Sequence, residues 1–237
     1  MSSTLTNPSE SLASRLVDGF TGWPAEALEL YVGLEADNSK SYWQAHRDVY
    51  ERAVKAPFLR LGDEVAREFG PLHLFRPYRD VRFARDKSPY KTAAAAVTEG
   101  PGGAGYYVQL SAEGLFVGSG YYALAPDQLE RWREAVADPR TGPRIAREVE
   151  RVRAAGYDTA AHESLKSAPR GYPKDHPRIE LLRNKGLTVG RSFEPARWLH
   201  TRAAYDRIVG VWRDAAPVNR WLDRHVGPST VAPREPV

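Results

Sequence analysis

Cysteine is absent from this chain of 237 residues. Its absence excludes a disulfide scaffold, thiolate chemistry, zinc fingers and cysteine-ligated iron–sulfur clusters. Long apolar runs are missing too, because no stretch approaches the roughly 20 apolar residues that a membrane-spanning helix needs. The N-terminus also lacks a basic start followed by an apolar stretch. We therefore expect a cytoplasmic protein that has no membrane segment.

The residues that are present suffice for a folded core. Hydrophobic residues make up 42% of the chain and aromatic residues 11%, which excludes disorder over most of it. This length suits one large domain or two small ones, and no internal repeat or long linker divides the chain. We expect a flexible leader at residues 1–18, a single domain at residues 19–225 and a flexible tail at residues 226–237.

Positive charge is unevenly distributed, although the formal net charge is only +4. The first basic segment, residues 76–92, holds six basic and two acidic residues. The second basic segment, residues 163–191, holds seven basic and three acidic residues. Acidic stretches elsewhere offset both segments. The mildly basic composition therefore indicates local sites rather than a polyanionic partner along the whole chain.

Helical periodicity dominates the N-terminal part of the chain. Pro24 suits the first position of a helix. Asp37-Asn38-Ser39 offers an N-cap for a second helix. Pro57 is expected to bend or restart that helix, and Gly70-Pro71 to end it.

The period then changes from helical to alternating, which predicts strands. We expect strands at residues 73–84, 93–97, 106–110 and 115–118, with a tight turn at Ser111–Gly114 joining the last two into a hairpin. Adjacent strands joined by short turns form an antiparallel sheet.

Helices return after these strands. We expect them at residues 126–136, 142–155, 177–184 and 199–222, with one more strand at residues 187–193 and an irregular segment at residues 156–176. Helices, then strands, then helices again predict the α+β class. The expected architecture is a single domain with a mainly antiparallel sheet flanked by N- and C-terminal helices.

Familiar cofactor and metal motifs are missing. Gly100-Pro-Gly-Gly-Ala-Gly105 matches the letters of the dinucleotide-binding fingerprint, but a strand rather than a helix is expected after it, which favours a hairpin turn. The six histidines are dispersed, and none pairs with another at ligand spacing. We therefore expect no cofactor and no metal.

The first basic segment combines arginine, aspartate, lysine and tyrosine. Alternate residues of a strand share a face, so Val81 and Phe83 facing the core would draw Arg79 inward. A buried guanidinium needs a carboxylate or a bound anion as partner. On the opposite face, Asp80 can hold Arg82 in a bidentate pair. A ligand site and a structural ion-pair network both fit this pattern.

The second basic segment leads into the helix predicted at Pro177. Asp175 or His176 would then be the cap, and backbone N–H groups there could face an anion. A simple loop before a helix is the alternative interpretation. Lys174 and His176 are the best contributors from this segment to a site shared with the first basic segment.

The run Arg76-x-x-Arg79-Asp80-x-Arg82-Phe83-x-x-Asp86-Lys87-x-x-Tyr90 resembles the hallmark of a bacterial family of conserved hypothetical proteins, domain-of-unknown-function family 2461. Other stretches are similar to the family's remaining motifs, in the same order over residues 19–224: Asn38-Ser-Lys40-Ser-Tyr-Trp43, Tyr106-Tyr107, Arg170-Gly-Tyr172-x-Lys174-Asp175-His176-Pro177 and Arg191-Ser192-Phe193. Tyr42-Trp43 departs from the expected Trp-Phe. The resemblance implies one whole-length domain and no particular substrate.

These patterns favour a binder of, or an enzyme acting on, an anionic small molecule that bears a phosphate or a carboxylate. In an enzyme, Arg79 and Arg82 would hold the charge while Asp80 or His176 handled protons. The candidate residues for ligand binding or an ion-pair network are Arg76, Arg79, Asp80, Arg82, Asp86, Lys87, Tyr90, Lys91, Arg170, Lys174, His176 and Arg191.

Two other functions remain open. A structural or partner-binding module would use the same residues as ion pairs that fix the sheet, and it predicts a strong destabilisation by Asp80→Ala through an unpaired buried charge. Nucleic-acid binding is the third hypothesis, because arginine and tyrosine alternate on the predicted strands. The modest net charge argues against it.

Overall fold

The computed structural model describes residues 19–82, 85–100 and 103–231. The chain forms two compact units, each assembled from separate segments of the sequence. The first unit comprises the described residues up to Ala96, with Gln109–Leu115 and Glu194–Arg207. The second unit comprises Val97–Val108, Phe116–Phe193 and the described residues from Ile208 onward.

The predicted α+β class is confirmed, since the described residues form helices and a six-stranded antiparallel sheet of order β1-β2-β3-β4-β6-β5. The strands are His73–Leu74 (β1), Ala93–Glu99 (β2), Gly105–Ser111 (β3), Gly114–Tyr121 (β4), Asp158–Ala160 (β5) and Leu187–Phe193 (β6). The expected β3–β4 hairpin and the strand at 187–193 are therefore confirmed.

The glycine-rich stretch before β3 is a turn rather than a nucleotide loop. Gly100 N–H donates to the carbonyl of Ala104 at 2.8 Å, and Gly103 N–H donates to the carbonyl of Gly100 at 3.0 Å. A strand begins directly at Gly105. No helix N-terminus follows to meet a pyrophosphate. Residues 101–102 lie outside the described residues.

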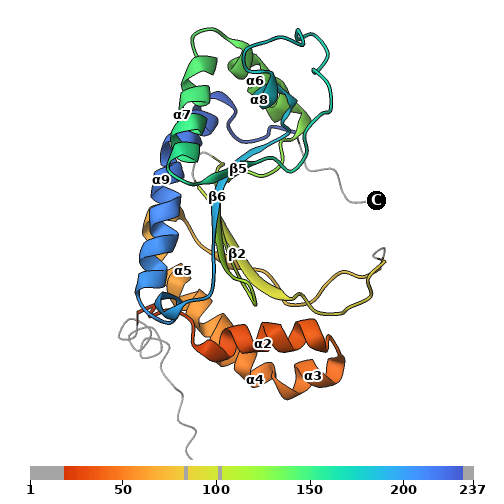
Figure 1. Cartoon of the computed structure of the whole chain (residues 1–237), viewed down its shortest axis with the longest axis vertical. Helices are drawn as coiled ribbons and strands as arrows, with labels where there is room; N and C mark the ends of the chain where they lie inside the picture. The colour runs from red at the N-terminus through yellow and green to blue at the C-terminus, as the bar shows by residue number, and fades with distance from the viewer. Residues whose placement is uncertain (1–18, 83–84, 101–102, 232–237) are drawn as a thin grey trace, which may run out of the picture. The chain divides into compact units, whose positions relative to one another are not determined.

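The first unit contains the N-terminal helices, of which α4 lies beside both α2 and α3 (Figure 1). They are Ala25–Ala36 (α2), Lys40–Ala45 (α3), Arg47–Val49 (α4), the π-helical Tyr50–Lys55 (η1) and Ala56–Phe69 (α5). Ser39 caps α3 as expected, because its Oγ accepts the N–H of Tyr42 at 3.1 Å. Gly70, with a φ of 90°, ends α5 as expected.

Pro57 explains the π-helical turn before α5. Proline has no N–H to donate and its ring clashes with the carbonyl four residues earlier. The preceding turn widens instead, and Ala56 N–H donates to the carbonyl of Glu51, five residues back. The helix thus restarts at Ala56 rather than running through, which was one of the two outcomes expected at Pro57.

The core of the first unit centres on Trp23. Its ring lies 4.8 Å from the ring of Phe20 and 4.9 Å from that of Phe58. Its backbone N–H donates to the carbonyl of Leu199 at 3.0 Å, within the 3-10 helix Arg197–His200 (η2). Burying three aromatic rings removes several hundred Å² of apolar surface from water, which is the main stabilising term in folding.

The second unit contains Pro126–Ala137 (α6), Gly142–Ala154 (α7), Ile179–Arg183 (α8) and most of Ala203–His225 (α9). Helix α6 packs against both α7 and α8 (Figure 1). Its Trp132 meets Trp221 of α9 edge-on, with the ring centroids 5.7 Å apart, and its Nε1–H donates to the carbonyl of Leu181 at 3.0 Å. A buried indole thus satisfies its donor while filling the core.

Three predicted elements were wrong. The strand expected at 73–84 ends at Leu74, because Pro77 cannot donate to a ladder and aspartate side chains bind the backbone beyond it. Pro177 is not the first residue of a helix: α8 begins at Ile179, with the non-helical Arg178 as its N-cap. The segment expected to be irregular contains β5, a strand of three residues.

The limits drawn for the leader, domain and tail stay predictions. Residues 226–231, expected in the tail, nevertheless contact α6. Val226 is buried, and Arg131 donates to its carbonyl at 2.5 Å. Asp127 accepts the N–H of Thr230 at 2.9 Å. The beginning of the predicted tail is therefore held in place.

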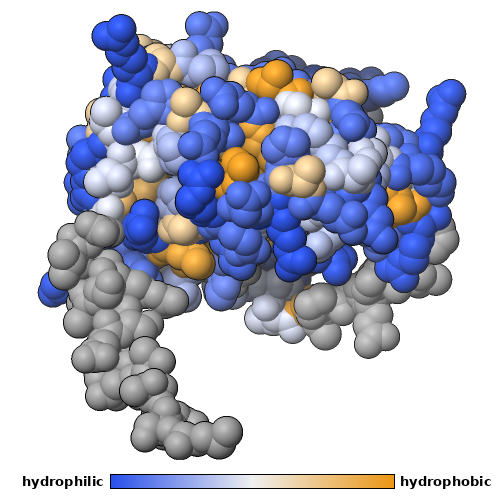
Figure 2. Space-filling model, turned by 90° about the horizontal axis from the view of Figure 1, so that it is seen from below, coloured by the Kyte–Doolittle hydropathy of each residue, from blue (hydrophilic) through white to orange (hydrophobic). Residues whose placement is uncertain are grey.

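On the face shown in Figure 2, apolar side chains form small separate patches between hydrophilic ones. Within the described part of the chain, no helix combines the length and the apolar character needed to cross a membrane.

Candidate functional site

Two of the sequence motifs meet in the first unit through Asn38 and Tyr90. The Asn38 side chain accepts the N–H of Tyr90 at 3.0 Å and donates to its carbonyl at 3.1 Å. Asn38 is fixed in turn by a bond to the carbonyl of Leu34 at 3.3 Å. The beginning of α3 thus anchors the end of the first basic segment.

The first basic segment forms a loop closed at its base by backbone pairing. Tyr78 and Tyr90 form an antiparallel bridge. Arg79 N–H donates to the carbonyl of Pro89 at 2.9 Å, and Lys91 N–H donates to that of Pro77 at 2.8 Å. We call the residues between these pairs, 79–82 and 85–89, the arginine loop; residues 83–84, including Phe83 of the hallmark, lie outside the described residues.

Asp86 organises one side of the arginine loop. Its carboxylate accepts the side chain of Arg79, the Ser88 N–H at 2.9 Å and the Ser88 hydroxyl at 2.6 Å. The Ser88 hydrogen bonds and then Arg79 hold the pKa of Asp86 well below its usual range. Lys87 donates to the carbonyl of Val81 at 2.9 Å. These residues stabilise the loop itself.

The predicted bidentate pair between Asp80 and Arg82 is confirmed. Arg82 Nε donates to Asp80 Oδ1 at 3.0 Å, and Nη2 donates to Oδ2 at 2.7 Å. The Arg82 hydrogen bonds lower the pKa of Asp80 to about 2. The side chain of Asp80 is 47% exposed and that of Arg82 77%. The structural alternative, which expected a buried charge at Asp80, was therefore wrong on this point.

The face argument for Arg79 was also wrong, since the described residues of this segment beyond Leu74 form no strand. Arg79 is half-buried and pairs with Asp86, while Val81 is only half-buried. Arg79 and Arg82 are therefore already partnered by carboxylates, whereas the exposed Arg85 makes no ion pair among the described residues. Two further arginines without an ion pair among those residues, Arg47 and Arg76, lie just outside the arginine loop.

A cavity of about 450 Å³ lies beside the base of the arginine loop, and we call it the loop cavity. It is lined by residues of α3, α4, the π-helical turn, α5 and the segment from β1 to Tyr78: Trp43, Arg47, Tyr50, Glu51, Lys55, Leu59, Leu72, His73, Leu74, Phe75, Arg76, Pro77 and Tyr78. This volume falls in the usual range of small-molecule sites, about 300–1,000 Å³.

Aromatic rings form one wall of the loop cavity. Trp43 lies 5.0 Å from Tyr50 and 6.1 Å from Tyr78, measured between ring centroids. Behind them, Tyr90 stacks on Trp43 at 4.7 Å. Burial, followed by the charge of Glu51, raises the pKa of Tyr50 to about 12, so this phenol stays protonated at neutral pH.

Cations without carboxylate partners flank this wall. Among the described residues, Arg47 and Arg76 make no ion pair, and both line the loop cavity. Lys91 lies over the ring of Phe75 with Nζ 5.3 Å from the ring centroid. Burial, followed by the charge of Arg76, lowers the pKa of Lys91. Two like charges thus lie near each other.

The candidates of the second basic segment fall in the second unit. Arg170 and Lys174 are exposed. His176 accepts the N–H of Arg178 through Nδ1 at 3.1 Å, which supports the turn before α8. Arg191 lies over the rings of Tyr157, at 5.8 Å, and Phe193. A site shared between the two basic segments stays a prediction.

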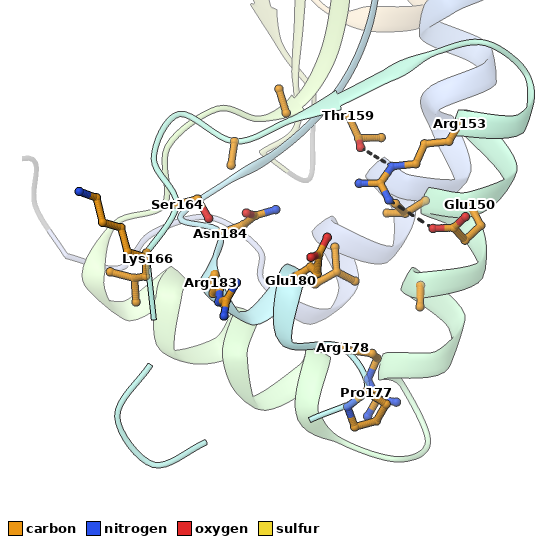
Figure 3. A pocket seen from close by; sticks show the side chains of 16 residues that line it. Glu150, Arg153, Thr159, Ser164, Lys166, Pro177, Arg178, Glu180, Arg183 and Asn184 are labelled. Carbon is orange, nitrogen blue, oxygen red and sulfur yellow. Dashed lines mark hydrogen bonds and ion pairs between the residues drawn. The ribbon is translucent and has the colours of Figure 1, made fainter. Parts of the chain in front are cut away.

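A second cavity, of about 470 Å³, lies in the second unit and is lined by α7, β5, α8 and residues 161–166 (Figure 3). Arg153 donates to Thr159 Oγ1 at 2.8 Å and to Glu150 at 3.2 Å. Arg178 donates to backbone carbonyls of α6, the nearest at 2.6 Å. Arg153 and Arg178 are thus engaged by the protein, whereas Arg183, which also lines this cavity, has a buried Nε without a hydrogen-bond partner among the described residues. The carboxylate of Glu180 lines the same space.

Arg47, Phe75 and the π-helical turn were missed by the sequence analysis. Arg47 lies four residues after Trp43, a spacing that would place both side chains on one face of an unbroken helix, although His46 separates α3 from α4 in the structure. That signal pointed to a shared surface. In the parts of the chain that the structure describes, no group of three or more acidic, histidine or cysteine side chains is arranged to hold a metal ion.

The chain is thus an α+β protein with a buttressed arginine loop beside a cavity that is both aromatic and cationic. The profile of the conserved hypothetical protein family DUF2461 matches residues 26–221. The chain therefore belongs to this family, which confirms the resemblance seen in the hallmark run. Searches of curated proteins and of solved structures found no match.

Proposed function

We propose that the loop cavity binds a small molecule that carries a phosphate or carboxylate group, as a ligand or as a substrate. One observation carries this proposal: Arg79 and Arg82 of the loop are paired with aspartates, whereas Arg47 and Arg76, which line the cavity, make no ion pair among the described residues. An anion between them would supply the missing negative charge.

The structural alternative describes the role of the ion-paired residues in the loop. Arg79, Asp80, Arg82 and Asp86 hold the arginine loop together, and this role is compatible with ligand binding next to the loop. We propose that the ion pairs position Arg76 and Lys91 at the base of the loop. Arg79 and Arg82 are then positioning residues rather than the cations that contact the ligand.

Calorimetric titration of the full chain with inorganic phosphate, methyl phosphate and acetate tests the proposal. We expect saturable binding of at least one of them. Arg47→Gln and Arg76→Gln should each weaken that binding on the order of tenfold, because hydrogen bonds to charged groups contribute about 1.5–3 kcal/mol. Arg220→Gln, which changes an exposed arginine of the second unit, is the matched control and should bind as the unchanged chain does.

Thermal melting of each variant checks that the fold is intact. The proposal fails if none of the three anions binds, or if both cavity variants bind as tightly as the control. Binding of single-stranded oligonucleotides that weakens steeply with salt, without binding of methyl phosphate, would instead support the nucleic-acid hypothesis. That hypothesis otherwise stays a prediction.

A further inference from the structure

Exposed apolar side chains concentrate at the loop cavity. Among the described residues, six large hydrophobic side chains are exposed, and three of them, Leu59, Phe75 and Tyr78, line this one cavity. They are 48%, 42% and 46% exposed. Single exposed apolar residues need no explanation, whereas apolar residues gathered in a concave site indicate a surface that a ligand covers.

The ring of Tyr78 is exposed but held in place. It meets Trp43 edge-on at 6.1 Å and lies 5.6 Å from Tyr90. The backbone of Tyr78 is fixed by its bridge to Tyr90, and Tyr90 is fixed by Asn38. A pre-positioned ring loses little conformational freedom on binding, and further aromatic contacts prefer the same 4.5–7 Å spacing.

Aromatic and cationic groups adjoin one another in this cavity. Phe75 and Arg76 are consecutive in the chain, and both line it. Lys91 lies 5.3 Å from the centre of the Phe75 ring. A ligand that contacts the ring of Phe75 therefore has cations beside it, which favours a molecule whose planar group and negative charge are close together.

We infer that the ligand of the loop cavity is an aryl anion, an aromatic ring that bears a phosphate or carboxylate directly or through a short link. This inference rests on the proposed function, because it takes the same cations as the anion site. It adds that Phe75 and Tyr78 contact the ring, while Leu59 covers its edge. The volume of about 450 Å³ accommodates a ring with one charged substituent.

Matched probes separate the contribution of the ring from that of the charge. Calorimetric titration of the full chain would compare phenyl phosphate with methyl phosphate, and benzoate with acetate. Benzyl alcohol supplies the ring without the charge. We expect the aryl member of each anion pair to bind about tenfold more tightly, since one aromatic contact contributes about 0.5–1.5 kcal/mol beyond the area that it buries.

Phe75→Ala and Leu59→Ala should remove most of this preference, measured as the ratio of phenyl phosphate affinity to methyl phosphate affinity. Both side chains are exposed, so these variants are expected to fold. Tyr122→Ala is the matched control, because Tyr122 is 66% exposed but belongs to the second unit. It should keep the full preference for phenyl phosphate.

The outcomes distinguish the two proposals. Equal binding of aryl and alkyl anions would overturn the aryl inference while the anion site stands. Loss of the preference in Tyr122→Ala as well as in Phe75→Ala would also overturn it. Binding of neither anion class would overturn both proposals. Benzyl alcohol binding as tightly as phenyl phosphate would show an apolar site without a role for charge, which again overturns both.

Discussion

Asn38 and Tyr90, separated by 52 residues, are joined by two hydrogen bonds between one side-chain amide and one backbone residue. The amide imitates a neighbouring strand, because it accepts from the N–H and donates to the carbonyl of the same residue. The link ties helix α3 to the base of the arginine loop, and Trp43 of that helix stacks on the ring of Tyr90. The cavity wall therefore depends on Asn38.

Asn38→Ala should lower the free energy of unfolding by about 1–3 kcal/mol, because it leaves a partly buried N–H and carbonyl of Tyr90 without their partner. Urea unfolding measures this change. Gln44→Ala removes an amide from an exposed position of the same helix and should have no such effect. Equal stability of the two variants would show that the Asn38 bonds do not anchor the loop.

The exposed pair of Asp80 and Arg82 should lower the pH at which Asp80 titrates. The hydrogen bonds from Arg82 lower the pKa of Asp80 from 3.8 to about 2. A carboxyl group whose pKa is lower in the folded than in the unfolded chain stabilises the fold at pH values above the unfolded-state pKa. This stabilisation is lost as the pH falls towards 2. Carbon-detected NMR titration should show that midpoint for Asp80, and Arg82→Gln should return it towards 3.8.

Arg220→Gln should leave the Asp80 midpoint where it is. Because both partners are exposed, Asp80→Asn should hardly change the melting temperature, since surface ion pairs contribute little to stability. A large loss of stability in Asp80→Asn would show that the pair does more than shape the loop.

Anion binding at the loop cavity should take up protons at alkaline pH. Burial and the charge of Arg76 lower the pKa of Lys91 in the free protein, and a bound anion nearby would raise it again. The complex would then hold more protons than the separate partners. Calorimetry with methyl phosphate in two buffers of different ionisation enthalpy measures the uptake, which Lys91→Met should remove and Lys174→Met, in the second unit, should not.

Two glycines of the second unit should respond in opposite ways to alanine. Gly120 has a φ of 138°, and a Cβ there would lie 2.2 Å from the carbonyl oxygen of Leu187. Gly120→Ala should therefore destabilise by more than about 1 kcal/mol. Gly210 lies inside α9 with nothing near its Cβ position, so Gly210→Ala should stabilise by about 0.5–1 kcal/mol.

Urea unfolding of the two glycine variants side by side gives the comparison. A destabilised Gly210→Ala, or an unchanged Gly120→Ala, would contradict the backbone geometry on which these expectations rest.

The elements that the sequence predicted well carry strong local signals. The hairpin around Ser111–Gly114 combines alternation with a tight turn, and the Ser39 side chain caps its helix by accepting an N–H three residues away. Strand β5 was missed because three residues are too few to show a period. The strand expected at 73–84 failed because Asp80 and Asp86 bind neighbouring backbone groups, which alternation does not reveal.

The candidate site likewise has a part that the sequence could predict and a part that it could not. The Asp80–Arg82 pair joins residues two apart and could be predicted. The loop cavity could not, because Arg47 and Arg76 come together only through the fold. Local spacing predicted the residues that shape the loop, whereas tertiary structure decides which cations remain open to a ligand.

The π-helical turn at Tyr50–Lys55 has a consequence for the register of the chain. Because an α-helix turns about 100° per residue, a turn that holds one extra residue rotates every later side chain by about that angle relative to an unbroken helix. Leu59 follows this turn and faces the loop cavity. Deleting one residue from the turn while replacing Pro57 would straighten the helix and swing Leu59 away from the cavity, so a backbone irregularity sets which surface of α5 the ligand meets.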